Sequence, residues 1–228
     1  MRLVTWNCGA GALEKKLPHL DELAADICVL QECLAPRIRV KNARWAGDHA
    51  KKGVAIVASG AWRIRRRRVR ERVPNYIVQF EVDGPTAFTV LAVWSKPHRR
   101  FPYVEGIHEA VRIYRTLITS RPTVILGDFN SNPIWDHQHR PAWSHSALVD
   151  RLRDLGLVSA YHAFHDETPG EETRATYYHT WNRRKPFHID YCFLPRNWAA
   201  KLRHVEVGGF NAWKHRSDHR PLVVDLAD

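Results

Sequence analysis

Short apolar runs recur along this chain, and each of five polar clusters lies at the end of such a run. An apolar run of roughly four to eight residues is typical of a buried β-strand. Polar residues directly beside several such strands are expected at one rim of a β-sheet, where side chains far apart in sequence meet. The clusters are Thr5-Trp6-Asn7, Gln31-Glu32, Gly127-Asp128-Phe129-Asn130, His188-Ile189-Asp190 and Ser217-Asp218-His219.

The same pattern predicts the order of the elements. Strands are expected over residues 2–6, 27–30, 53–58, 76–82, 87–94, 123–126, 187–194 and 222–226, and the turn Asp83-Gly84-Pro85 predicts that two of them form an antiparallel hairpin. Helices are expected over residues 13–24, with Pro18 as an internal irregularity, over 104–118, and over 146–155, where Gly156 supplies a C-terminal cap. Strands outnumber helices, which favours two packed mixed sheets with helices outside.

Length and composition narrow the class of protein. At 228 residues the chain suits one α/β domain, residues 1–228. The first expected strand starts directly after Met1, and no apolar stretch approaches the roughly 20 residues of a membrane span, so we expect no signal peptide, no membrane association and a cytoplasmic location. The cysteines lie in or beside apolar runs without paired spacing, which predicts buried free thiols.

The chain is strongly basic, with a net charge of +11 and a pI near 9.8. Such a balance favours a polyanionic partner, nucleic acid above all. Genome composition is the alternative explanation, because arginine, alanine and tryptophan are frequent and lysine is scarce.

The chemistry of the clusters indicates a hard cation and a phosphate. Carboxylates, carboxamides and one imidazole are the groups they offer, and oxygen ligands suit Mg²⁺. Each cluster also has a simpler interpretation. Glu32 alone would be an exposed acid at a strand end, Asp128 and Asn130 an Asx-stabilised turn, and Asp218-His219 a surface pair.

The order and content of the clusters resemble the endonuclease/exonuclease/phosphatase superfamily, the metal-dependent phosphoesterases that include deoxyribonuclease I and exonuclease III. The resemblance runs from Leu3 to Leu226 and rests on the combination of W-N, Q-E, G-D-F-N, I-D-Y and S-D-H-R-P in this order. It implies a four-layer α/β sandwich, two packed mixed β-sheets flanked by helices. It also implies a hydrolase that uses Mg²⁺, or Mn²⁺, to attack a phosphate ester in line with an activated water.

The resemblance also assigns roles to individual residues. Metal binding falls to Asn7, Glu32 and Asp218. Asp128 positions and deprotonates the attacking water, and Asn130 contacts the phosphoryl oxygens. The imidazole of His219 stabilises charge on the transition state, with Asp190 as its orienting partner.

Two positions depart from the family pattern. Some family nucleases carry a carboxylate two residues after the first-strand Asn, where this chain has Gly9, so a second metal site lacks that ligand. Many members place a His or Tyr on the phosphate from the strand that here ends at Val93-Trp94-Ser95. Trp94, His98 and Tyr103 are the candidates for that contact.

Aromatic and basic residues supply further candidates for substrate binding. Trp181 is one of several aromatic residues in expected loops, where a ring stacks on a base or simply packs in the fold; the others are Trp135, Trp143, Tyr177, Tyr178 and Trp213. The arginine-rich segment 63–72 is either a solvated edge strand or a track for a phosphate backbone that would use Arg63, Arg65, Arg67 and Arg70.

The sequence therefore predicts a metal-dependent phosphodiesterase, with a DNA endonuclease or exonuclease as the first hypothesis. Charge alone favours DNA over the first alternative, a phosphatase or diesterase of a small metabolite or lipid headgroup. The second alternative is a non-catalytic nucleic-acid-binding module, which would not need a water-activating Asp beside a metal-binding Glu. Nothing in the sequence indicates an obligate protein partner.

Overall fold

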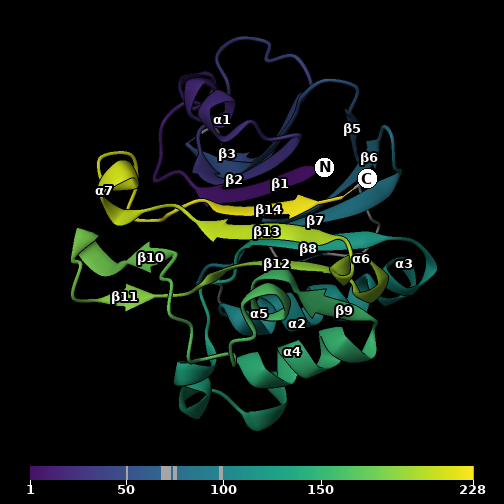
Figure 1. The fold of residues 1–228 in the computed structure, drawn as a ribbon, viewed down its shortest axis with the longest axis vertical. Coiled ribbons are helices and arrows are strands. Elements are labelled where there is room, and N and C mark those ends of the chain that lie inside the picture. The colour runs from purple at the N-terminus through teal and green to yellow at the C-terminus, as the bar shows by residue number, and fades with distance from the viewer. Residues whose placement is uncertain (50, 68–72, 74–75, 98–99, 228) are drawn as a thin grey trace.

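Two mixed β-sheets lie face to face at the centre of the computed structural model, which describes residues 1–49, 51–67, 73, 76–97 and 100–227 (Figure 1). Within these residues the first sheet has the strand order β13 (Leu202–Val207), β14 (Leu222–Leu226), β1 (Arg2–Asn7), β2 (Ile27–Cys33), β4 (Lys52–Ala58) and β3 (Ala43–His49). The second sheet has the order β5 (Arg63–Arg66), β6 (Ile77–Asp83), β7 (Phe88–Trp94), β8 (Thr123–Asp128), β12 (Asp190–Pro195) and β9 (Leu157–Ser159).

Successive side chains of a strand pack alternately between the two sheets and against the helices outside them. In β1, Leu3 faces the interior between the sheets, whereas Val4 and Trp6 face outward toward a helix. In β8, Leu126 faces the same interior and Ile125 faces the helices on the other side. Successive side chains of a strand point to opposite faces, so strands covered on both sides must be apolar throughout.

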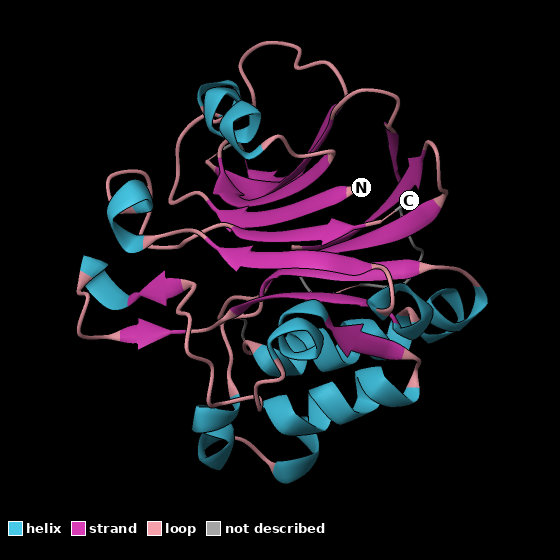
Figure 2. Cartoon of the chain, in the orientation of Figure 1, coloured by secondary structure: helices cyan, strands magenta, loops and turns pink. Residues whose placement is uncertain are grey.

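Helices cover the outer faces of both sheets (Figure 2). The helix α1 (Leu17–Leu23) packs on the first sheet, and α2 (Val104–Ile113) and α4 (His145–Asp154) pack on the second. The result is the four-layer α/β sandwich that the sequence predicted. The shorter helices are α3 (Arg115–Ser120), α5 (Ala160–His165), α6 (Arg196–Ala199) and α7 (Phe210–Trp213), with 3₁₀ turns η1 (Leu13–Lys15), η2 (Pro133–Gln138), η3 (Pro141–Trp143) and η4 (His179–Trp181).

Two expected helices are shorter than the apolar pattern suggested. Residues 13–24 form η1 and then α1, because Pro18 occupies the first turn of α1, where its missing N–H is not needed. Residues 104–118 divide at Tyr114 into α2 and α3. The glycine cap of α4 is confirmed, since Gly156 has a φ of +83° just after the helix.

One expected strand is also divided. Residues 187–194 contribute Phe187 to a separate two-stranded ribbon, β10 (Tyr177–Tyr178) and β11 (Pro186–Phe187), and the central sheet resumes only at Asp190. The expected hairpin is confirmed, since β6 and β7 pair antiparallel from Ile77↔Val93 to Val82↔Phe88. The strands β3, β9, β10 and β13 were not predicted, because their half-exposed residues do not form an apolar run.

Strand directions bring the polar clusters to one rim. β1 runs parallel to β2, and β7 parallel to β8, so these four strands end at the rim, while the antiparallel β12 and β14 begin there. The two chain termini lie together at the other end of the sandwich, where the Met1 ammonium donates to the Leu226 carbonyl (Figure 1).

All four cysteines are buried and free, as the sequence predicted. In the part of the chain described, no helix is both long and apolar enough to cross a membrane.

Candidate active site

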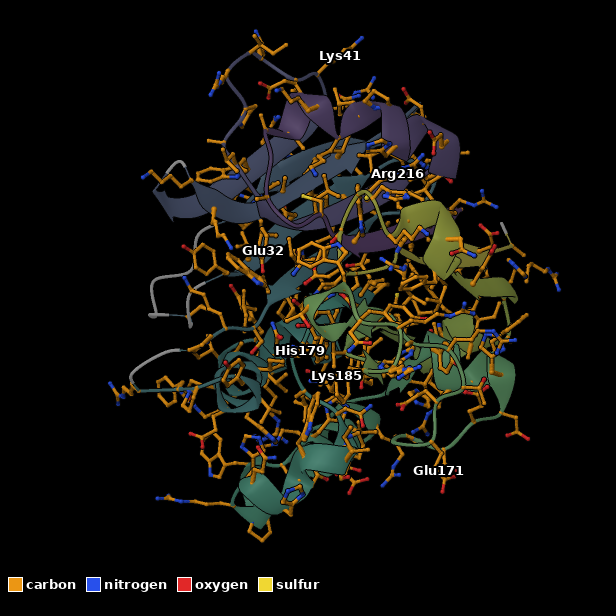
Figure 3. All side chains as sticks on the ribbon, turned by 90° about the vertical axis from the view of Figure 1, so that its left-hand side faces the viewer. Glu32, Lys41, Glu171, His179, Lys185 and Arg216 are labelled. Carbon is orange, nitrogen blue, oxygen red and sulfur yellow. The ribbon has the colours of Figure 1, made fainter. Side chains whose placement is uncertain are left out.

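Asn7 and Glu32 lie at the ends of two adjacent parallel strands. Asn7 is the last residue of β1, and it is in register with Gln31 of β2. The register between β2 and β4 shifts between Leu30 and Cys33, and Glu32 has a φ of +59°. Such a bulge redirects a side chain, and here the Glu32 carboxylate lies 3.3 Å from Asn7 Nδ2. Figure 3 views this rim, with Glu32 on the face of the molecule.

Asp128 is the best anchored carboxylate of the site. It is fully buried at the end of β8 and accepts hydrogen bonds from Asn7 Nδ2 at 2.9 Å, from the Asn130 backbone at 2.9 Å and from Asn130 Nδ2 at 3.0 Å. Asn130 Nδ2 also donates to the Ser95 carbonyl at 2.8 Å. Asn130 has a φ of +45°, a conformation that Asn tolerates better than most residues. Both sides of the carboxylate are therefore held in place.

Gly127 allows two neighbouring strands to pack closely. It has a φ of +148°, and a Cβ at this position would lie 1.9 Å from the Val93 carbonyl oxygen. Phe129 is fully buried, as predicted. The glycine thus lets β7 and β8 approach each other at the point where Asp128 leaves the sheet.

His219 is bonded to Asp190, the partner that the sequence predicted. The distance from His219 Nδ1 to Asp190 Oδ2 is 2.8 Å, and His219 Nε2 lies 4.0 Å from Asp128 Oδ2. Both carboxylates are fully buried and the His219 side chain is 6% exposed. The Tyr177 ring packs against the imidazole at 4.6 Å between centroids.

The electrostatics of this group favour a protonated imidazole. Burial by itself would lower the pKa of His219, but the Asp190 and Asp128 carboxylates outweigh burial and raise it to about 9. Burial raises the pKa of Asp128 to about 7, against the opposing influence of His219. A carboxyl group with a pKa near neutrality suits proton transfer, and a cationic imidazole suits an anionic phosphoryl group.

The loop before β14 is fixed by Ser217 and Arg220. Ser217 Oγ donates to the Asn7 carbonyl at 2.7 Å and accepts from the His219 backbone N–H at 3.0 Å. Arg220 is fully buried and donates to the Ser217 and His219 carbonyls at 2.7 and 2.9 Å. This network joins the last cluster of the sequence to the first.

The donor set fits a hard divalent cation. Glu32 and Asp128 flank the Asn7 carboxamide, and Glu32 Oε2 already attracts a cation, because it lies 2.6 Å from Lys52 Nζ. Asp128, Asp190 and His219 also bring their ligating atoms within 4.8 Å of one another. A protonated His219 does not ligate a metal, so Glu32 with the neighbouring Asn7 carboxamide is the better fit to Mg²⁺.

Asp218 is half-buried beside His219, and its carboxylate accepts a hydrogen bond from Ser217 Oγ at 3.4 Å. Its charge raises the pKa of His219. Within the described residues no hydrogen bond or ion pair links Asp218 to Glu32, and its role as a metal ligand stays a prediction.

Two of the other residues predicted to contact substrate lie near the site, and Trp181 does not line the same pocket. Trp94 and Tyr103 line a pocket of about 400 Å³ that also reaches Glu32 and Asn130. Trp181 lies in η4 and is 56% exposed, but it does not line this pocket. His98 and Arg70 lie outside the described residues.

The first part of the arginine-rich segment, Arg63–Arg66, forms the edge strand β5, and residues 68–72 lie outside the described residues. Arg63 is in register with Asp83, at the end of β6 farthest from Ile77 and the rim. Arg65 pairs with Asp83 at 2.7 Å. Arg67 pairs with Glu81 at 2.8 Å. The structure therefore does not bring Arg63 and Arg65 to the site, which speaks against a continuous track.

The aromatic residues expected in loops are mostly packed. Trp213 is 7% exposed and contacts Trp6 at 5.0 Å between ring centroids. Trp135 packs on Phe187 and Trp143 on His108.

Several residues of the site were missed by sequence reasoning. Lys52 directly precedes the apolar run of β4, but its place beside Glu32 depends on the antiparallel pairing of β4 with β2, for which the sequence carried no signal. Lys96 follows β7, the strand that ends at the rim beside β8. For Ser217 and Arg220 the signal was their position within the last cluster.

Comparison with known proteins supports the fold. No family model matches the sequence, and no curated protein matches it. Among solved structures, the chain is similar to a 3′-5′ exonuclease, NExo, from Neisseria meningitidis, with a TM-score of 0.73 and 21% identity. It is similar to a Neisseria 3′ phosphatase NExo bound to a product DNA hairpin, with a TM-score of 0.71 and 21% identity.

An AP endonuclease from Archaeoglobus fulgidus is similar with a TM-score of 0.70 and 18% identity. In all three comparisons the alignment covers 100% of this chain and 100% of the other. With two mixed six-stranded sheets in the described residues and helices on both outer faces, the chain has the fold of the endonuclease/exonuclease/phosphatase superfamily.

Proposed function

We propose that this protein is a divalent-metal-dependent phosphodiesterase that hydrolyses DNA. The observation that carries the proposal is the position of Asp128, a buried carboxylate fixed by Asn7 and Asn130 and lying 4.0 Å from the imidazole of His219. Asp128 lies between the proposed metal-binding residue Asn7 and the cationic imidazole of His219. A carboxylate in this position suits the activation of a water.

In the proposed reaction each residue has a defined task. Asp128 orients a water and accepts its proton as the water oxygen bonds to phosphorus and the bond to the leaving oxygen breaks. His219, held by Asp190, donates a hydrogen bond to a phosphoryl oxygen as negative charge builds on it. Asn130 holds Asp128 in place and lies beside the reacting phosphate. A Mg²⁺ or Mn²⁺ held by Glu32 and Asn7 would supply charge neutralisation at the phosphate and the leaving oxygen.

Charge and structural similarity support DNA as the substrate. The chain carries a net charge of +11, and the similar structures include one that holds a DNA hairpin. A small phosphorylated metabolite or a lipid headgroup is the alternative, since the residues described around Asp128 suit any phosphate ester.

The test is a panel of plasmid, single-stranded DNA, RNA, abasic duplex and small phosphate esters, assayed with Mg²⁺ and with Mn²⁺. EDTA is expected to abolish hydrolysis. Asp128→Asn is expected to reduce the rate by at least ~10²-fold while the thermal unfolding midpoint stays near that of the wild type. Asp150→Asn, an exposed change on α4, is the matched control and should keep full activity. Full activity in EDTA would contradict the proposal, and hydrolysis of small esters alone would favour the alternative.

A further inference from the structure

The pocket beside Glu32 is lined by ammonium groups and aromatic rings. It holds about 400 Å³, and apart from Glu32 its lining includes Lys52, Lys96, Tyr76 and Trp94. Figure 3 views the rim of the sheets and shows Glu32 on that side of the molecule. Because Glu32 and Asn130 both line the pocket, it lies beside the proposed reaction centre.

The two lysines flank one indole ring. Lys96 Nζ lies 5.3 Å from the Trp94 ring centroid, and Lys52 Nζ lies 5.9 Å from it. Lys96 Nζ also lies 3.5 Å from the centroid of Tyr76, whose ring packs on Trp94. These ring faces hold the ammonium groups in position, since a cation is attracted to the face of an aromatic ring.

The charges of this pocket do not cancel. Lys52 is paired with Glu32 at 2.6 Å. In the part of the chain described, no carboxylate lies within 4.0 Å of Lys96 Nζ, so one positive charge is left for an anion. Two ammonium groups that line one pocket suit the binding of a phosphate.

Tyr103 supplies an exposed aromatic face to the same pocket. It is 37% exposed, and its backbone N–H donates to the Lys96 carbonyl at 3.2 Å, which ties the two residues together. It has a φ of +47° and a ψ of −120° just before α2, a costly conformation for a residue other than glycine. An exposed ring held in this way suits stacking against a planar base.

We propose that this pocket binds one nucleotide unit of the substrate, next to the phosphate that reacts. Its phosphate lies between Lys52 and Lys96, and its base stacks on Tyr103. The inference rests on the proposed function and deepens it, because a sugar phosphate or a lipid headgroup has no base for the ring of Tyr103. Nucleotide recognition thereby separates a nuclease from a general phosphatase.

Equilibrium binding in EDTA tests the pocket without hydrolysis. The probes are a fluorescent single-stranded oligonucleotide, with a nucleoside 5′-monophosphate and ribose 5-phosphate as competitors. Lys96→Gln is expected to weaken oligonucleotide binding about tenfold at low salt and to flatten the slope of log K against log salt by ~0.7, the value for one single-strand phosphate contact. Tyr103→Leu is expected to weaken the oligonucleotide and the nucleotide about tenfold and to leave ribose 5-phosphate unchanged.

Matched controls separate the pocket from general effects of charge and ring size. Lys41→Gln removes an exposed lysine at the far end of the same face, away from Glu32 (Figure 3). Phe164→Leu removes a ring that is also 37% exposed but belongs to α5. Both controls should bind like the wild type, and thermal unfolding of all four variants should match it.

Two outcomes would overturn the inference. One is equal weakening by Lys96→Gln and Lys41→Gln, which would leave only diffuse charge. The other is ribose 5-phosphate competing as well as the nucleotide, which would remove the base contact. Hydrolysis of bis(4-nitrophenyl) phosphate with Mg²⁺ or Mn²⁺ is measured separately. Its absence would count against the proposed function, while the binding results would still decide the pocket.

Discussion

His219 is positioned by groups from three separate segments of the chain. Asp190 accepts from its ring, Ser217 Oγ accepts from its backbone N–H, and Tyr177 packs on its face. If the imidazole stabilises transition-state charge, His219→Ala should lower kcat by ~10²-fold or more and change KM little. Asp190→Asn should act in the same direction with a smaller effect. Steady-state kinetics decide this, and a His219→Ala variant with normal kcat and raised KM would make His219 a binding residue.

Glu172 is a buried carboxylate away from the reaction centre. It accepts from Asn132 Nδ2 at 3.0 Å and from the Gly170 N–H at 3.1 Å, and it contacts His162 Nε2 at 3.1 Å. Burial by itself would raise the pKa of Glu172, but the hydrogen bonds from His162 and Gly170 and the charge of His188 lower it from 4.5 to about 2. The ionised form is therefore the one that the fold stabilises.

The sign of the pH effect follows from this lowered pKa. The stability that Glu172 contributes is fully present above pH 4.5 and is lost as pH falls toward 2. Glu172→Gln should lower the free energy of unfolding by on the order of 2 kcal/mol at pH 7, and this difference should shrink below pH 4.5. Urea unfolding from pH 7 to pH 3 measures it. Glu171→Gln, at the exposed neighbour, should show no such dependence, and a pH-independent loss in Glu172→Gln would refute the ionic contribution.

At the scale of elements, the close approach of β7 and β8 depends on Gly127. Gly127→Ala would place a Cβ 1.9 Å from the Val93 carbonyl and impose an L-residue on a φ of +148°. We expect a loss of at least ~2 kcal/mol, which at this chain length lowers Tm by roughly 4–8 °C. Hydrolysis should fall further than Tm alone explains, because Asp128 follows directly.

Gly209→Ala is the control for this change, since Gly209 has no positive φ and a Cβ there meets nothing within 4 Å. Calorimetry and initial rates on both variants make the comparison. If Gly127→Ala unfolds at the wild-type temperature with full activity, the strands do not constrain Asp128 in the way described.

The apolar pattern predicted the strands that are buried on both faces and missed several half-exposed strands. β1, β2, β7 and β8 stood out as apolar runs because both of their faces are covered. β13 has only one buried residue, Val205, and β10 has two residues in all, so neither carried a signal. Pro18 was read as an irregularity inside a helix although it begins one, because the sequence pattern is the same until the preceding turn is known.

At the scale of the whole molecule, two arginines of the described part of segment 63–72 lie away from the site. Arg63 and Arg65 lie toward the end of β5 and β6 away from the rim, and Arg65 is paired with Asp83. Replacing both with Gln should change the free energy of unfolding by less than ~0.5 kcal/mol, because exposed ion pairs contribute little.

Duplex DNA binding by this double variant should keep the salt dependence of the wild type. Titrations over a range of NaCl concentrations measure the slope of log K against log salt. A slope flatter by ~0.9 for each arginine would show that they contact phosphates and would restore the track as an interpretation.

The sequence by itself determined which polar groups lie at the ends of buried strands, whereas the tertiary structure decided their contacts. Asn7, Glu32, Asp128, Asp190 and His219 were all foreseen, because a polar residue beside a buried strand must lie at a sheet end. Strand direction and register, which the sequence does not encode locally, placed Lys52 against Glu32 and Lys96 against Tyr76. The same register places Arg63 opposite Asp83, away from the rim. Lone charged residues carry no periodic signal, so their partners become known only when distant strands are paired.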